Sequence, residues 1–94
     1  MPQRSNGENR EPAPTLLAHL DDWERIRVRL RLSAREAELI RHLFTGRKLQ
    51  VIAADMGLCL GTVKTYSQRI HHKLGVHDRF ELALAVIRTH LSRA

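Results

Sequence analysis

The sequence predicts a small all-α domain, a helical bundle built around a helix-turn-helix. Hydrophobic residues make up 43% of the 94 residues but aromatic residues only 4%, so the core must be aliphatic, which suits packed helices better than a sheet. Ala53, Gly57 and Val63 have the spacing at which two crossed helices need a small residue, a turn with positive φ and a buried contact. Because a chain of this length has room for one core, we expect a single domain over residues 15–94.

The N-terminal part divides into a tail and a helix. Residues 1–14 are polar and contain all three prolines. They cannot bury enough apolar surface to offset the entropy lost on ordering, so we expect a disordered tail. From residue 15 to 30, apolar side chains recur mostly at helical spacing, which predicts one added N-terminal helix. Trp23 and Ile26 should place it on the domain body.

The next helix should begin at Ser33, because Ser33 and Glu36 have the spacing of a capping box. Gly46 should end this helix. Its buried stripe should consist of Ala37, Leu39, Ile40, Leu43 and Phe44. Residues 47–56 then form the first helix of the helix-turn-helix. Leu49 and Val51 make its start unusually apolar, so we expect either the N-terminal helix or a partner to cover them.

The second helix of the motif should run from about Leu60 to Leu74. Its inward side should carry Val63, Ser67, Ile70 and Leu74. Its outward side should carry Lys64, Thr65, Gln68 and His72. A cationic face with nothing to pack on suits a DNA groove.

Cys59 precedes this helix and is a poor N-cap acceptor, so we expect Thr62 to take over as the cap. Our interpretation of Cys59 is an inert buried thiol. The alternative, a redox switch at the turn, would need exposure and a lowered pKa.

The last helix should start at a second capping box, Asp78 with Glu81, and run to about Ser92. It is apolar nearly all round, which burial against its own domain does not require. We therefore expect two protomers to pair through it. The expected dimer interface consists of Leu82, Ala83, Val86 and Ile87.

Composition restricts the class of function. Sixteen Lys and Arg against ten Asp and Glu give a net charge of +6, which favours a polyanionic partner, either nucleic acid or an acidic membrane face. With no bilayer-spanning apolar run and no signal-peptide core, we expect a cytoplasmic protein that does not insert into membranes. The single cysteine and the scattered histidines predict no disulfide and no metal site. With no nucleophile elbow or glycine-rich phosphate loop, we expect no enzyme activity, no cofactor and no small-molecule site.

The residues around the motif resemble the LuxR-type (GerE-like) DNA-binding domain over about two thirds of the chain. The matching residues are Leu32, Ser33, Arg35, Glu36, Gly46, Ile52, Ala53, Thr62, Val63, Lys64, Ile70, Lys73, Leu74, Arg79, Glu81 and Leu82. The resemblance implies the four helices of that domain, here with one helix added, in a stand-alone transcriptional regulator. It also implies that the helix from about 60 to 74 lies in the major groove of its operator.

The resemblance implies that Lys64, Thr65 and Gln68 read bases. Their chemistry fits, since Lys donates to guanine acceptors, Gln can pair bidentately with adenine, and Thr offers a methyl group to thymine. The expected phosphate contacts are Thr62, Lys73 and Arg79, with Arg69 and Arg47 as further candidates. Double-stranded DNA and a second copy of the chain are the expected partners, and RNA polymerase is a further candidate.

Two other classes of protein remain open. A sigma-factor-like promoter-recognition fragment would have a similar motif, but it needs a second, polymerase-binding domain that this length excludes. A protein-interaction module could have kept the fold and lost the groove contacts. The apolar Leu49, Val51, Cys59 and Leu60 favour that alternative. The basic Lys64, Lys73 and Arg79 argue against it.

Overall fold

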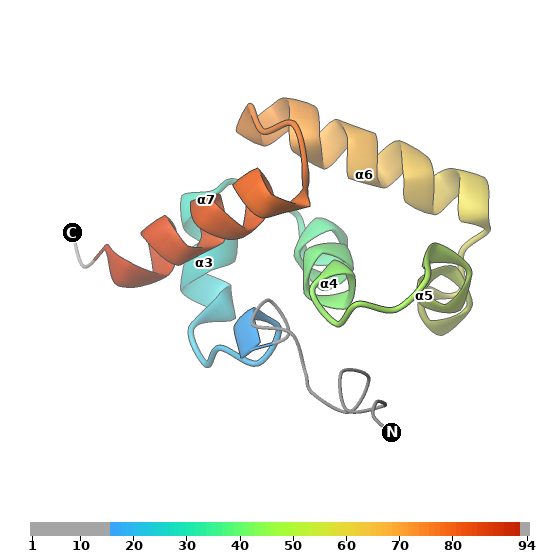
Figure 1. The fold of residues 1–94 in the computed structure, drawn as a ribbon. Helices are drawn as coiled ribbons and strands as arrows, with labels where there is room; N and C mark the ends of the chain where they lie inside the picture. The colour runs from blue at the N-terminus through green and yellow to red at the C-terminus, as the bar shows by residue number, and fades with distance from the viewer. Residues whose placement is uncertain (1–15, 93–94) are drawn as a thin grey trace, which may run out of the picture.

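The computed structural model describes residues 16–92, and this part of the chain forms five α-helices and no strand. The helices are α3 (Trp23–Arg29), α4 (Ala34–Leu43), α5 (Leu49–Met56), α6 (Leu60–Leu74) and α7 (Arg79–Leu91). In Figure 1, α6 lies across α4 and α5, while α3 and α7 lie together at the other end of the molecule. The predicted all-α fold is confirmed, with α4–α7 as the four expected helices and α3 as the addition. The predicted tail, residues 1–14, lies outside the described residues.

The added helix is shorter than predicted. A single helix over residues 15–30 is wrong, because α3 covers only Trp23–Arg29, and turns at residues 18–19 and 21–22 separate it from the helical residues 16–17. The chain folds back between the two, and Trp23 Nε1 donates to the Leu17 carbonyl at 2.7 Å. A donor six residues after its acceptor could not reach it along a straight helix. Ala18, Trp23 and Ile26 are buried, so both parts of this segment join the core.

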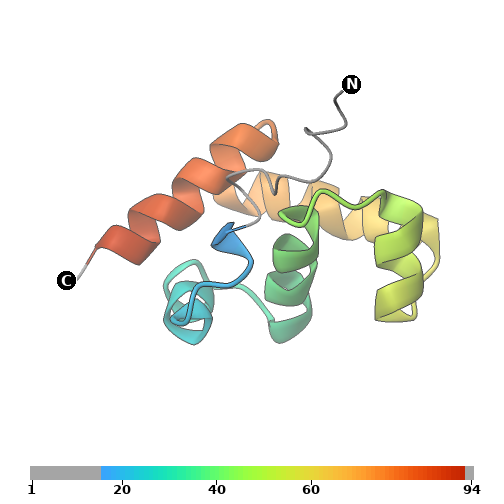
Figure 2. The same ribbon diagram turned by 60° about the horizontal axis from the view of Figure 1, so that its bottom comes forward.

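One core runs through all five helices. Its fully buried side chains include Ile26 from α3, Leu39 and Ile40 from α4, Ile52 from α5, Val63 and Ile70 from α6, and Leu82 and Val86 from α7. Figure 2 shows α4 between the α3–α7 pair and the α5–α6 pair, which lets a single helix contact both. The core is mostly aliphatic, as composition predicts, and it also buries the aromatic side chains of Phe44 and Trp23.

Of the two capping boxes predicted from the sequence, the one at the start of α4 is complete and the one at the start of α7 is half formed. Ser33 and Glu36 form the predicted capping box, with Ser33 Oγ accepting from the Glu36 N–H at 3.0 Å and Glu36 Oε1 accepting from the Ser33 N–H at 2.8 Å. The second predicted box is half formed. Asp78 accepts from the Glu81 N–H at 2.8 Å, but the Glu81 carboxylate takes its N–H from His77 instead of Asp78.

Three helices end in the same type of cap. In this motif, the residue after the helix takes a left-handed conformation and the next N–H bonds back to the last turn. Gly57 after α5 and Gly75 after α6 have φ of 69° and 68°, and glycine adopts this conformation without strain. After α3 the position is occupied by Arg31 with φ of 60°, and the Leu32 N–H donates to the Arg27 carbonyl at 2.9 Å. The end of α3 therefore carries backbone strain that the other two ends avoid.

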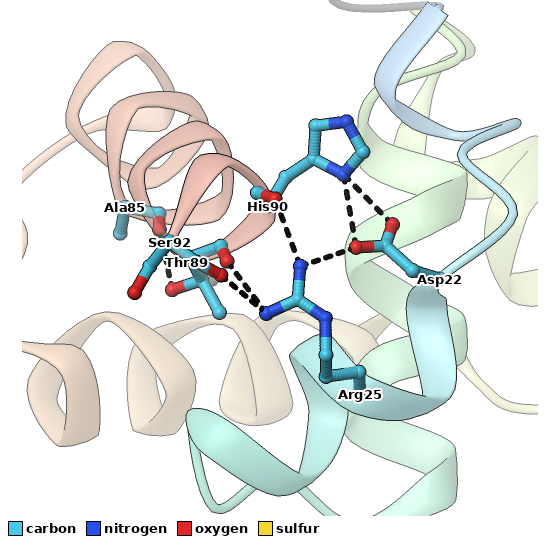
Figure 3. A network of polar contacts seen from close by, with 6 residues as sticks. All are labelled: Asp22, Arg25, Ala85, Thr89, His90 and Ser92. Atoms are coloured by element: carbon cyan, nitrogen blue, oxygen red, sulfur yellow. Dashed lines mark hydrogen bonds and ion pairs between the residues drawn. The ribbon is translucent and has the colours of Figure 1, made fainter. Parts of the chain in front are cut away.

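A polar network fastens the end of α7 to α3 (Figure 3). The Arg25 guanidinium donates to the carbonyls of Thr89 at 3.1 Å, His90 at 2.8 Å and Ser92 at 2.8 Å, and to the Asp22 carboxylate at 2.6 Å. His90 Nδ1 lies 2.8 Å from the same carboxylate. Burial raises the pKa of Asp22, but the hydrogen bonds with Arg25 and His90 outweigh it and hold that pKa below its ordinary value. Arg25 thus satisfies carbonyls that a helix end otherwise leaves without donors.

Candidate nucleic-acid interface

The turn between α5 and α6 has the geometry of a helix-turn-helix. The Leu58 N–H donates to the Ala53 carbonyl at 2.8 Å, which closes the turn around the left-handed Gly57. Ala53 and Val63 are buried where the two helices meet. The three residues from which the motif was predicted therefore have the predicted roles.

One side of α6 faces solvent, as its helical spacing predicts. Val63 and Ile70 are fully buried on the inward side. The exposed residues of α6 are Gly61, Lys64, Thr65, Gln68, Arg69, His72 and Lys73. The guanidinium of Arg69 lies 5.6 Å from the centre of the Tyr66 ring, a cation–π contact that holds it beside the exposed face. The expected base-reading residues are thus accessible on one helix face.

Three of the expected DNA-binding residues line one shallow groove, although they come from separate segments. Arg47 precedes α5, Lys64 lies on α6 and Arg79 is the first residue of α7. The groove, which we call the basic groove, has a volume of about 380 Å³, and Lys48, Leu49, Gln50 and Leu60 complete its lining. Lys48 was not among the expected contacts, because the helix was expected to start at residue 47, whereas α5 starts at Leu49 and leaves Lys48 as its N-cap.

The helix ends at the basic groove are open to an anion. Lys48 and Cys59 are the N-cap residues of α5 and α6, and neither side chain bonds to the backbone of its helix. The first N–H groups of a helix have no intrahelical partner, and the helix dipole adds a partial positive charge there. Leu49, Gln50 and Leu60, the residues that open these helices, line the groove. Such an arrangement suits phosphate oxygens.

Cys59 is exposed, so the expectation of a buried thiol is wrong. Thr62 does not replace it as the cap either, because α6 starts at Leu60 with Cys59 as N-cap. Instead, Cys59 Sγ lies 3.1 Å from Thr62 Oγ1, and this hydrogen bond lowers the pKa of the thiol. The physical reason for both differences is that the chain must be extended at residue 59 to leave the turn, which places its short side chain outward.

Lys73 is engaged inside the domain, which argues against its expected phosphate role. Its ammonium donates to Glu36 Oε1 at 2.7 Å and to the Arg31 carbonyl at 3.2 Å. Burial would raise the pKa of Glu36, but the bonds from Lys73 and the Ser33 N–H hold it below its ordinary value. Lys73 therefore joins the end of α6 to the start of α4. Arg47 also has a partner, since it pairs with Asp55 at the surface.

The expected dimer interface needs correction. Leu82, Ala83 and Val86 are buried in the core of their own chain, so they are not available to a second protomer. Ile87 remains partly exposed. The apolar residues that α7 leaves outside the core are Phe80, Leu84, Ile87 and Leu91, at helical spacing along one face. Phe80 and Leu91 are each 69% exposed. The excess of apolar surface on α7 was predicted from the sequence. Three of the four residues expected to form it lie on the buried face of the helix.

Residues 16–92 contain neither a cluster of metal ligands nor a helix that could cross a bilayer. No three histidine, cysteine or carboxylate side chains within that range lie close enough to hold a metal ion. His71 Nδ1 lies 2.6 Å from the Ser67 carbonyl, so this histidine makes a local hydrogen bond to the backbone of its own helix. None of the described helices is long and apolar enough to cross a bilayer.

Comparison with known proteins identifies the family. Residues 30–86 match the family model of bacterial regulatory proteins of the luxR family, which covers more than half of the chain. The chain belongs to the LuxR family. The resemblance seen in its sequence is confirmed, and α4–α7 constitute the helix-turn-helix domain of this family.

Similar proteins include the probable transcriptional regulatory protein NarL of two Mycobacterium tuberculosis strains, 40% identical over 60 residues, or 64% of this chain. The HTH-type transcriptional activator RamA of Corynebacterium glutamicum is 36% identical over 64 residues, or 68% of this chain. The LuxR-family chain described here spans only 28% and 23% of the lengths of these relatives. No solved structure matched it significantly.

Proposed function

We propose that this LuxR-family chain regulates transcription by binding a specific DNA sequence, with α6 in the major groove. The basic groove is the main support for this proposal. It places Arg47, Lys64 and Arg79 beside two open helix N-termini, and the exposed polar face of α6 adjoins it. Backbone phosphates require cations and N–H donors of this kind, and base edges require exposed polar side chains on one helix face.

The residues proposed to contact DNA divide into two roles. Lys64, Thr65 and Gln68 read base edges, because they lie near the start of α6 on its solvent side. The proposed phosphate contacts are Thr62, Arg69, Arg79, Arg47 and Lys48. Lys73 leaves this set, because its ammonium is held by both Glu36 and the Arg31 carbonyl, whereas Arg47, paired with Asp55, keeps a more exposed side chain, 49% against 37%.

We further propose that two chains bind together. The exposed apolar face of α7 would be removed from water by pairing with the same face of a second copy. Phe80 and Leu91 replace Leu82 and Val86 as the residues expected at this contact. Two half-sites about one helical turn apart would then be expected in the operator. RNA polymerase stays a candidate partner of the bound complex.

An interaction module without specific DNA binding is the second candidate. Val51 on α5 is 45% exposed, and neither α3 nor any other described part of the chain covers it. A partner protein could bind there. This alternative predicts weak DNA binding with little dependence on sequence or salt.

Selection of bound sequences from a random DNA pool tests the proposal. A recovered two-fold symmetric sequence would support both specificity and dimeric binding. Titration of the selected and a scrambled duplex should then show that Gln68→Ala or Lys64→Ala costs about 1–3 kcal/mol on the selected duplex and less on the scrambled one. Arg79→Ala is the matched control, since loss of a phosphate contact should weaken both duplexes equally.

Two results would count against the assignments. If Gln68→Ala and Lys64→Ala weaken both duplexes by the same factor, these residues hold phosphates and do not read bases. If no sequence is enriched and binding barely changes with salt, the interaction module is the better description.

A further inference from the structure

A second cleft shares Arg47 with the basic groove. It has a volume of about 290 Å³ and lies between residues 18–19 and the C-terminal half of α4. Its polar lining consists of His19, Glu38, Arg41, His42, Thr45 and Arg47. We call it the flanking cleft. His19 belongs to the turn before α3, which lies outside the residues matched by the family model.

The charge of the flanking cleft favours an anion. It contains two arginines, which are always charged, against one carboxylate, and two histidines add ring N–H groups. That carboxylate, Glu38, pairs with Arg35 outside the cleft at 2.9 Å and lies 3.9 Å from His42 Nε2 inside it. Arg47 pairs with Asp55, but nearly half of its side chain remains exposed, at 49%. Arg41 forms no ion pair within residues 16–92, so the cleft keeps an excess of positive charge after these pairs are formed.

The cleft is held in place by contacts that leave the two terminal nitrogens of Arg41 available. Arg41 Nε donates to the Ala18 carbonyl at 3.1 Å, and its guanidinium lies 6.0 Å from the centre of the Trp23 ring. Within the described residues, its two terminal nitrogens make no hydrogen bond. Ala18 is buried and Trp23 holds the Leu17 carbonyl, so the backbone directly before His19 is anchored. Preorganised donors lose little freedom when they bind a phosphate.

We infer that the flanking cleft binds the phosphodiester backbone of the DNA beyond the base pairs read by α6. The inference rests on the proposed function, because it needs a duplex already seated in the basic groove. Arg47 lines both depressions, so basic side chains continue from Lys64 and Arg79 through Arg47 to Arg41, and the His19 ring lies beside Arg41 in the same cleft. A phosphate backbone is a continuous row of anions, and it matches such a continuous row of cations. A free phosphate-bearing ligand has the same chemistry and is the alternative source.

The test compares two duplexes that share the selected site. One ends at the site, and the other is extended by about half a helical turn, roughly five base pairs, on each side. The extended duplex should bind with a log–log salt slope steeper by about one to two, because each phosphate neutralised adds about 0.9. His19→Glu and Arg41→Gln should bring the slope and affinity for the extended duplex back toward those of the short one. His19 is exposed, so its variant stays informative if Arg41→Gln lowers stability.

Arg88→Gln is the matched control. It removes one positive charge from α7, outside both the basic groove and the flanking cleft. Its effect should be the same on the two duplexes. If His19→Glu, Arg41→Gln and Arg88→Gln all reduce the preference for the extended duplex equally, that preference reflects net charge alone. This result would overturn the inference.

The remaining outcomes separate this inference from the proposed function. Specific binding to both duplexes with equal slopes overturns the flanking cleft and leaves the proposed function intact. Absence of specific binding to either duplex overturns both. Titration with inorganic phosphate, followed by NMR at His19 and His42, tests whether the cleft binds a free phosphate-bearing ligand instead of DNA. Saturation at low phosphate concentration without any effect of duplex length would identify a small-anion site and overturn the assignment to DNA.

Discussion

Replacing Lys73 by Met separates a structural role from a phosphate contact. The ammonium of Lys73 lies 2.7 Å from Glu36 Oε1, with side-chain exposures of 37% and 11%. A hydrogen bond to a charged group contributes about 1.5–3 kcal/mol when it is shielded. Because water reaches the ammonium, we reduce this to about 1–2 kcal/mol. Met keeps most of the apolar stem, so the loss of charge dominates.

The expected consequence is a large thermal shift with little effect on DNA binding. For a domain of this size, about 1 kcal/mol corresponds to roughly 4–8 °C in melting temperature. Circular dichroism should therefore show Lys73→Met melting about 5–15 °C below the parent chain. Its salt slope on duplex DNA should be unchanged. Arg79→Met is the control with the opposite pattern, since it should lose about one in salt slope and change stability by less than about 0.5 kcal/mol.

The effect should also depend on pH. The pKa of Glu36 is lowered in the folded state, so its contribution to stability is complete above its unfolded value, about 4.3, and is lost as the pH falls through the lower folded value. The stability difference between the parent chain and Lys73→Met should thus be constant from pH 7 to about 5 and shrink below about 4. A melting temperature that stays unchanged at pH 7, together with a salt slope lower by about one, would refute this reasoning and restore the phosphate role.

Three further substitutions test local features by thermal unfolding. Cys59→Ser should raise stability by about 0.5–2 kcal/mol, because it supplies the missing N-cap acceptor of α6; an unchanged melting temperature would mean that another group already caps the helix. Arg31→Gly should add about 1 kcal/mol by relieving the left-handed strain after α3, whereas Arg31→Ala should not. Ser33→Ala should cost about 1 kcal/mol through loss of the capping box, and Ser33→Thr should retain most of it.

Features fixed by neighbouring residues were predictable from the sequence. The Ser33–Glu36 box and the turn at Gly57 depend on residues a few positions apart, whose geometry follows from helix rules alone. The solvent face of α6 was also predictable, because a sharp change from apolar to polar residues around a helix identifies its buried side.

Features fixed by tertiary contacts were not predictable. The Lys73–Glu36 pair joins residues 37 positions apart, and nothing in either local sequence indicates it. The helix α7 is apolar on both sides, so its periodicity could not tell Leu82, which is buried, from Phe80, which is exposed. The basic groove depends on how α5, α6 and α7 cross, which the identity of Arg47, Lys64 and Arg79 does not determine.

The network around Arg25 extends the cooperatively packed part of the chain beyond residues 30–86, which match the family model. Asp22, Arg25, Thr89, His90 and Ser92 all lie outside residues 30–86, on the two sides of the family match. A fragment cut at those limits would lose Trp23 and Ile26 from the core and the guanidinium that closes the end of α7. Its last helix should fray and its remaining core should be partly open to water. For this chain, alignment limits are therefore a poor guide to where it can be shortened.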